Sequence, residues 1–511
     1  MSSTGSKNTA SSNTPSDNTT GSPDQIPHAE VSNPGAVAAV VVLCFGGLIA
    51  SLMQTLIIPI QPELPQLLNT SISNASWVIT ATLLGAAVAM PIAGRLGDMV
   101  GKQRVLIASG VLLVAGSLIC ALAGSLVPMI VGRAVQGLAM GFIPVGISLI
   151  REIVPPRMAT TSIAAMSATL GVGGAIGLPL SAWIAQSFNW HMLFWVSAAL
   201  AAVVAILVVL VVPHVHDSAG GRFDTVGAIG LAVGLVSALI AISKGNDWGW
   251  GEPTTLGLLA FGVIVLIGWG FFELRHSDPL VDLRTTARPA VLLTNIAAVA
   301  VGFGMMAQAI VIPMVLEMPA ATGYGLGQSI LAAGLWMAPG GLMMMFFAPV
   351  SGKLINTIGA KYTLAIGATV LGAGYLAAFF LMNSPWQLML ASLICSAGVG
   401  IGYAAMPTLI MGAVPITEAG AAVGLNGLMR SIGTTCASAI MALVLTMSTV
   451  NLGGHEIPTQ SAFHWCFMIA AAAAFVGAVI TLAIPTGTAP TADDALSGAT
   501  PAEPAELDAT H

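Results

Sequence analysis

Fourteen long apolar segments constrain the fold of this chain more than any other feature. A helix that crosses the bilayer core, which is about 30 Å thick, needs about 20 consecutive apolar residues, and each segment meets that length. Strands of a membrane barrel would be about 10 residues long and alternating, whereas these segments are continuous. The sequence therefore predicts an all-α integral membrane protein. The predicted spans are 36–60, 75–94, 104–124, 127–150, 158–183, 190–212, 224–243, 254–273, 290–314, 326–350, 362–382, 386–412, 420–447 and 463–485.

Composition excludes a soluble protein. Only 7% of the 511 residues are charged, against about 25% in soluble domains, so most of the surface must face lipid. The net charge is −6, and two polar ends, 1–34 and 486–511, carry −2 and −5; we expect both ends to be disordered tails. The segment between them carries almost no net charge, which gives no indication of a nucleic-acid partner. The five cysteines form no CxxC pair, so we expect no disulfide framework, metal site or cofactor.

The distribution of basic residues predicts the orientation. Short cytoplasmic loops are enriched in Lys and Arg. If both termini are cytoplasmic, the loops on that side hold eleven basic residues and the outer loops hold only Lys244. We therefore expect a cell-membrane protein with both termini on the cytoplasmic side. The eleven are Arg95, Lys102, Arg104, Arg151, Arg157, Arg222, Arg275, Arg284, Arg288, Lys353 and Lys361.

An internal repeat predicts two related halves. Residues 91–101 read PIAGRLGDMVG, and residues 349–359 read PVSGKLINTIG. Proline, glycine and basic positions match at one offset, and repeats of this kind are typical of secondary transporters. We expect six-helix bundles at 35–212 and 290–485, with two inserted helices at 213–289. The alternative is that 91–101 and 349–359 are merely similar turns.

The loop after the second span carries the densest motif, GRLGDMVGKQR. Its glycines allow a tight turn between packed helices. Asp98 can accept from amides at a helix N-terminus or pair with a basic neighbour, and such a charge clamp can break and re-form between two conformations. The motif contributes Gly94, Arg95, Asp98, Gly101, Lys102 and Arg104.

This loop resembles the signature GxLaDrxGrkxxl of the major facilitator superfamily, and the fourteen spans resemble its drug:proton antiporter branch. The resemblance covers about residues 36–485 and implies that the loop is a gate latch at the inner face. It also implies a bacterial cell-membrane protein that works as a monomer. A plain basic turn is the alternative for the loop.

Span four contains GRAVQG, which is similar to the family pattern RxxQG. A charged residue within a span is costly and usually has a role. The resemblance implies that Arg133 assists proton coupling, with Gln136 beside it. An arginine that reaches the membrane surface is the alternative. Arg430 in span thirteen is a second intramembrane charge and invites the same interpretation.

Span five contains GVGGAIGLPLSA. Gly173 and Gly177 lie four apart and allow close helix packing, and Pro179 can kink the helix. The segment resembles the antiporter motif of exporters, although Leu178 separates Gly177 from the proline and Ser181-Ala182 replace the usual glycine pair. Ordinary small-residue packing is the alternative.

Span one departs from the family pattern. Fourteen-span members usually carry an Asp two residues before a Thr, whereas Met53 precedes Thr55 here. Proton antiport needs an accessible acid, and Glu317 and Glu63 are the remaining candidates for it, although both end spans at the outer side.

These observations predict a secondary transporter that exports small hydrophobic or amphipathic drugs or metabolites by proton antiport. One alternative is an uncoupled facilitator or importer, which Met53 favours; another is a membrane sensor with the same fold. We expect no enzyme, because no nucleophile and base converge and no GxxxxGK[ST] motif for ATP occurs.

Overall fold

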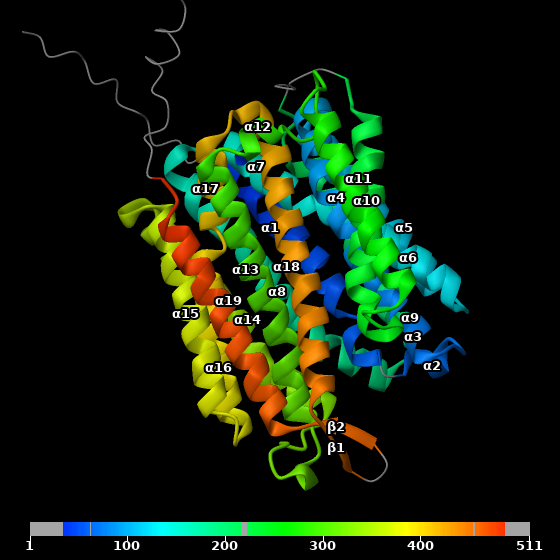
Figure 1. The fold of residues 1–511 in the computed structure, drawn as a ribbon. Coiled ribbons are helices and arrows are strands. Elements are labelled where there is room, and N and C mark those ends of the chain that lie inside the picture. The colour runs from blue at the N-terminus through cyan, green and yellow to red at the C-terminus, as the bar shows by residue number, and fades with distance from the viewer. Residues whose placement is uncertain (1–33, 62, 216–221, 453–454, 486–511) are drawn as a thin grey trace, which may run out of the picture.

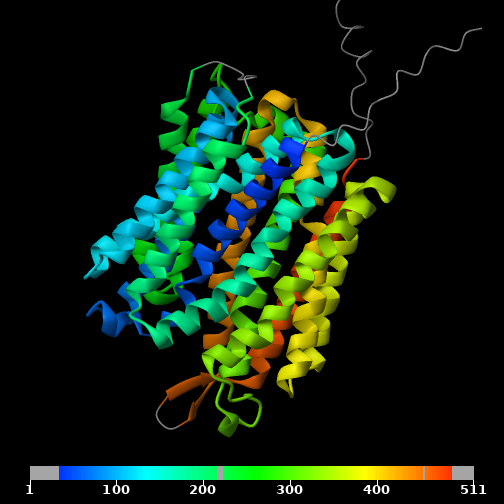
Figure 2. The ribbon, with the colours of Figure 1, turned by 180° about the vertical axis from the view of Figure 1, so that it is seen from behind.

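The fold is a bundle of fourteen long apolar helices, seen in the computed structural model from two sides (Figures 1 and 2). The structure describes residues 34–61, 63–215, 222–452 and 455–485. Each predicted span overlaps one of these helices, which confirms the all-α membrane fold. The long helices are α1 (Pro34–Thr55), α4 (Trp77–Val100), α5 (Lys102–Ala121), α6 with α7 (Leu126–Leu138, Phe142–Ile153), α8 (Pro156–Ser187), α9 (His191–Val211), α10 (Thr225–Trp248), α11 (Pro253–Glu273), α13 (Pro289–Glu317), α14 (Ile330–Ile358), α15 (Ala360–Phe380), α16 with α17 (Pro385–Gly402, Ala405–Ala413), α18 (Ala419–Met447) and α19 (Gln460–Leu482).

Short elements connect the long helices. A β-hairpin, which the sequence did not predict, lies between α18 and α19, with Thr449 paired to Pro458. The predicted tails lie outside the described residues, apart from Pro34. The short elements are α2 (Leu64–Leu67), α3 (Ile72–Ala75), α12 (Leu283–Thr286), β1 (Thr449–Leu452), β2 (His455–Pro458) and the 3₁₀ turns Ile58–Ile60, Ala139–Gly141, Ala320–Thr322 and Ile416–Glu418.

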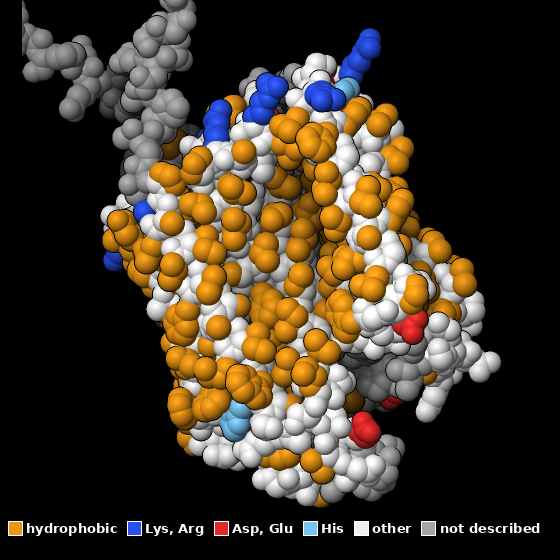
Figure 3. Space-filling model, viewed as in Figure 1, with side chains coloured by type: hydrophobic (Ala, Val, Ile, Leu, Met, Phe, Trp, Pro, Cys, Tyr) orange, Lys and Arg blue, Asp and Glu red, His pale blue; other side chains and the backbone are white. Residues whose placement is uncertain are grey.

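The two ends of the bundle differ in charge. Lys and Arg side chains gather at the end that carries α12, while the flanks are apolar (Figure 3). We call this end the basic face and the opposite end, which carries β1 and β2, the hairpin face. Exposed Arg104, Arg284 and Arg288 belong to the basic face. The apolar flank between the faces is what a bilayer core requires.

The long helices form two sets that meet along a seam. We call α1–α9 the N-terminal half and α13–α19 the C-terminal half. Across the seam α4 packs against α18, and α8 packs against α14. Helix α10 contacts both α4 and α18, whereas α11 contacts α10 and is otherwise largely exposed. Helix α10 therefore lies against both halves at the seam, and α11 packs on α10.

Lys244 lies in a different place from the one predicted. Helix α10 continues to Trp248, so Lys244 is part of the helix and not of an outer loop, and it is buried. Its ammonium donates to Asp247 at 3.0 Å and to Ser76, and it lies 5.0 Å from the ring centre of Trp77. This cation therefore fixes α10 to the start of α4.

Two spans are broken at matching positions in the halves. The fourth span of the N-terminal half breaks between α6 and α7, and the fourth span of the C-terminal half breaks between α16 and α17. Pro144 and Pro407 each follow a break and remove one backbone donor from the helix. Broken helices are tolerated at membrane depth where protein or a cavity covers them.

Candidate functional site

Asp98 joins the two halves at the basic face. It lies near the end of α4 with 1% of its surface exposed. Its carboxylate accepts from the backbone N–H groups of Gly420 at 3.1 Å and Ala421 at 2.8 Å, which begin α18. A carboxylate at a helix N-terminus is stabilised by unpaired amides and by the helix dipole. The predicted charge clamp therefore joins α4 to a helix 322 residues away.

Lys102 completes this clamp. Its ammonium lies 3.0 Å from Asp98 and also bonds Glu152 at the end of α7. Lys102 is 5% exposed, so water screens the pair little. The charged side chains of the clamp therefore all belong to the N-terminal half, to α4, α5 and α7. The C-terminal half contributes backbone amides to Asp98. The contact can break without separating a salt bridge between the halves.

The two copies of the repeat share a turn but not a clamp. Gly101 and Gly359 both end their helices with positive φ, 100° and 88°, a conformation that favours glycine. The partner position of Asp98 is Asn356, which is exposed. The structure therefore places a buried acid at only one of the two equivalent turns.

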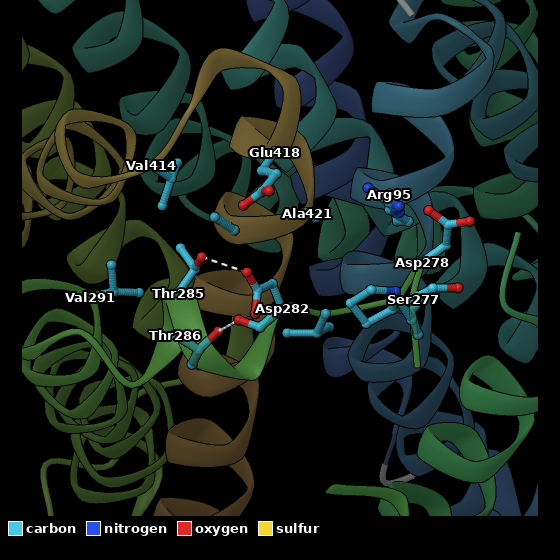
Figure 4. A pocket seen from close by; sticks show the side chains of 14 residues that line it. Arg95, Ser277, Asp278, Asp282, Thr285, Thr286, Val291, Val414, Glu418 and Ala421 are labelled. Atoms are coloured by element: carbon cyan, nitrogen blue, oxygen red, sulfur yellow. Dashed lines mark hydrogen bonds between the residues drawn. The ribbon is translucent and has the colours of Figure 1, made fainter. Parts of the chain in front are cut away.

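The other basic residues of the loop lie outside the clamp. Arg104 is exposed and donates to the Val100 carbonyl at 3.4 Å. Arg95 lines a cavity of about 240 Å³ beside the clamp, opposite Glu418 and Asp282 (Figure 4). Partial burial alone would raise the pKa of Asp282, but hydrogen bonds from Thr285 outweigh it and hold this pKa below its ordinary value. The cavity therefore has charged and polar groups in its wall and borders the clamp at Ala421.

Arg133 is buried inside the N-terminal half and does not reach the membrane surface. Only 1% of it is exposed. It donates to the Met53 carbonyl at 3.0 Å, the Val78 carbonyl at 3.3 Å and Gln136 Oε1 at 2.9 Å. The Gln136 side-chain amide in turn donates to Ser117 Oγ at 2.8 Å. Met53 occupies the position at which the family pattern has an acid. It thus accepts a hydrogen bond from Arg133 through its backbone carbonyl.

We expect Arg133→Ala to destabilise the protein, because buried acceptors on α1, α4 and α6 lose their donor. An unpaired buried polar group costs about 1–3 kcal/mol. The measurement is the melting temperature of the purified protein in one detergent. Arg104→Ala is the control, because Arg104 is exposed; an equal melting temperature for wild type and Arg133→Ala would contradict the expectation.

Gly173 and Gly177 of span five pack α8 against α1. A Cβ on Gly173 would lie 2.6 Å from Ser51 Cβ, and one on Gly177 would lie 2.0 Å from Thr55 Oγ1. The hydroxyl of Ser51 also donates to the Leu170 carbonyl at 2.7 Å. Pro179 lies within α8, which continues to Ser187. This packing is inside the N-terminal half, while Gly171 of the same helix lies against Met344 of α14 across the seam.

Glu63 and Glu317 lie apart from this network. Glu63 is exposed at the start of α2, and Glu317 is exposed at the end of α13. Neither forms an ion pair with a residue that the structure describes. A second pair of acids is buried instead: Asp224 caps α10 by accepting from Gly227 N at 2.7 Å, and Glu273 at the end of α11 is 2% exposed. These two carboxyls face the same point beside Gly227.

A small central cavity lies between the halves, and sequence reasoning did not find most of its residues. Residues at or next to both helix breaks line it. A glycine or proline inside a predicted span was therefore the sequence signal that could have indicated this cavity. Arg430, near the middle of its span, lies with its guanidinium carbon 4.8 Å from the ring centre of Tyr403. The lining residues are Ile143, Pro144, Ile147, Tyr403, Pro407, Val423, Asn426, Gly427 and Arg430.

Comparison with solved structures gives the same fold. The human organic anion transporter MFSD10 matches with a TM-score of 0.62 and 14% identity, over 87% of this chain and 99% of that one. The proton:xylose symporter XylE matches with a TM-score of 0.62 and 15% identity, over 91% and 99%. At these identities the likeness shows the fold alone.

Sequence comparison gives relatives among bacterial transporters. An uncharacterized MFS-type transporter of Mycobacterium tuberculosis is 27% identical over 405 residues, which is 78% of this chain and 58% of the relative. The chain thus spans little more than half the length of that relative. The multidrug transporter protein MdtP of Bacillus subtilis is 24% identical over 75% of this chain and 70% of its own. The putative multidrug resistance protein MdtD of Salmonella is 25% identical over 88% and 94%.

The family model described as Major Facilitator Superfamily matches residues 43–434 and again 296–507. The first match alone covers most of the fourteen spans, including the clamp and both helix breaks. The chain therefore belongs to the major facilitator superfamily, whose members are membrane transporters and not enzymes.

Proposed function

We propose that this chain is a secondary exporter of small hydrophobic or amphipathic molecules, driven by proton antiport through alternating access of its two halves. The observation that carries the proposal is the bond from Asp98 of α4 to the first amides of α18. It joins the halves at one face only and can break without leaving a charge unpaired, because Lys102 stays with Asp98. A contact of this kind suits a gate.

Two further features support the direction and the substrate class. MdtP and MdtD carry names that refer to multidrug transport or resistance. The Lys and Arg side chains of the basic face support a cytoplasmic position for it, and we propose that the clamp is the inner gate in a bacterial cell membrane. We propose that the chain belongs to the fourteen-span drug:proton antiporter branch and acts as a monomer, with no cofactor.

Efflux of a fluorescent lipophilic compound from cells that express the protein tests this proposal. We expect efflux that stops when an uncoupler removes the proton gradient. Efflux that ignores the uncoupler would contradict antiport and favour an uncoupled facilitator, the second candidate, which Met53 in place of the usual acid supports. Loss of all movement with every compound would favour a protein that senses and does not transport.

The coupling acid can be identified in proteoliposomes. Our candidates are Glu317 and Glu63, and the buried pair Asp224 and Glu273 adds two more. Replacing the coupling acid with its amide should abolish transport driven by a pH gradient but retain exchange of labelled for unlabelled substrate, because exchange needs no proton. Glu456→Gln, in the exposed β2 strand, is the control and should change neither rate.

A further inference from the structure

The only fixed charge that lines the central cavity is positive. Arg430 forms no hydrogen bond or ion pair with any residue that the structure describes, and its close contact is the ring of Tyr403. A guanidinium carries five N–H donors in a planar fork, and none of those of Arg430 has an acceptor among the described residues. The cation–π interaction with the ring offsets part of the free-energy cost of placing the charge there, but it provides no hydrogen-bond acceptor for the N–H donors.

Tyr403 provides a second unfilled group at the same place. It lies at the break between α16 and α17, with 2% of its surface exposed, and its hydroxyl has no hydrogen-bond partner in the described part of the chain. Buried hydroxyls are usually bonded, and an unbonded one is costly. Arg430 and Tyr403 thus present unfilled hydrogen-bonding groups side by side from two elements of the C-terminal half.

No acid among the residues that the structure describes balances Arg430 locally. The cavity lining contains no Asp or Glu. The buried acids among the described residues are Asp98, Asp224 and Glu273, and all three lie at helix ends on the basic face, where Asp98 is bound by Lys102. A charge inside the membrane usually pairs with another group or marks a substrate pathway, so the missing partner is one that a ligand can supply.

Apart from Asn426, whose amide donates to Asn295 Oδ1 at 3.0 Å, the rest of the cavity is apolar and shared between the halves. Ile143, Pro144 and Ile147 come from α7, and Val423 and Pro407 face them from α18 and α17. The space is about 10 Å³, about the room of one water molecule. The site therefore has no room for a larger molecule in this conformation, and residues at or next to the two helix breaks border it.

We propose that Arg430 and Tyr403 bind the carboxylate of the transported molecule, so that the substrates are amphipathic organic anions. This inference rests on the proposed function as a transporter of small amphipathic molecules and narrows its substrate class. The planar fork of arginine matches a carboxylate with two parallel hydrogen bonds, the Tyr403 hydroxyl donates a third, and the apolar part of the substrate lies against Ile143, Ile147 and Val423.

Binding of two dyes with the same ring system tests the proposal. The purified protein is titrated against fluorescein, which is anionic, and rhodamine 123, which is cationic, with fluorescence anisotropy as the readout. We expect fluorescein to bind at least about tenfold more tightly than rhodamine 123. Arg430→Gln should weaken fluorescein binding by about 10- to 100-fold, the worth of charged hydrogen bonds, and bring the two dyes closer in affinity.

Two milder variants cover the case in which Arg430→Gln fails to fold. Arg430→Lys keeps the charge but loses the fork and should weaken fluorescein binding less than Arg430→Gln. Tyr403→Phe removes one donor and should weaken it by about 3- to 10-fold. Lys353→Gln, an exposed basic residue on the basic face, is the matched control and should change neither dye. Melting temperatures establish which variants are folded.

Three results would overturn the proposal: rhodamine 123 binding as tightly as fluorescein, no fluorescein binding up to about 1 mM, or unchanged fluorescein affinity in folded Arg430 and Tyr403 variants. The titration uses no gradient. A failure of proton coupling therefore leaves its result intact, while uncoupler-sensitive efflux of rhodamine 123 alone would support export and reject the anion site.

Discussion

Replacing Asp98 with Asn should reduce transport by at least about a hundredfold while the protein still reaches the membrane. The amide keeps one acceptor oxygen but loses the charge and the second oxygen, so one of the bonds to Gly420 and Ala421 is lost and the ion pair with Lys102 disappears. Charged hydrogen bonds contribute about 1.5–3 kcal/mol each, and about 1.4 kcal/mol is tenfold in an equilibrium. The closed state of the gate then loses most of the free energy that stabilises it relative to the open state.

Two measurements check this expectation. Efflux gives the loss of transport. Labelling of Ala422→Cys in inside-out vesicles, by a maleimide that cannot cross the membrane, reports opening, because Ala422 lines the cavity beside the clamp. Labelling should be faster with Asp98→Asn than without it. Asn356→Ala is the matched control at the equivalent turn, where the side chain is exposed. Efflux at the wild-type rate in Asp98→Asn would reject the clamp as a gate.

The spans and the repeat could be predicted because each depends on local sequence. A membrane span needs only length and apolar composition, so all fourteen were recognisable. The repeat was readable because a turn between packed helices requires glycine at one position, and Gly101 and Gly359 both adopt positive φ there. Pro144 and Pro407 were visible too, but a proline in a span does not by itself show whether the helix breaks.

The partners in the site could not be predicted because many are backbone atoms. Asp98 bonds amides of α18, and Arg133 bonds the carbonyls of Met53 and Val78. Every residue offers the same backbone groups, so the sequence carries no signal of which ones are used. Lys244 shows the converse: a lysine near a span end looks like a loop residue, and only the fold reveals that Asp247 and Ser76 bury it.

Gly94→Ala should block transport by preventing the halves from closing at the basic face. A Cβ on Gly94 would lie 2.1 Å from the Gly420 carbonyl oxygen and 2.6 Å from its carbon, far inside van der Waals contact. The atoms it meets are backbone of α18, which cannot rotate away as a side chain can. The clash is removed only if α4 and α18 separate, which also takes Asp98 away from the amides it bonds.

Gly257→Ala is the matched control, because a Cβ on Gly257 in α11 would have no atom within 4 Å. It should transport like wild type, and wild-type efflux in Gly94→Ala would contradict the packing. In Gly94→Ala, the Ala422→Cys reporter should label as fast as in Asp98→Asn. Because both changes open one contact, the double variant should label no faster than either single variant. If the two changes acted on independent contacts, their effects on the labelling rate would add. Additive effects would therefore show that packing at Gly94 and the charge of Asp98 stabilise different states of the protein.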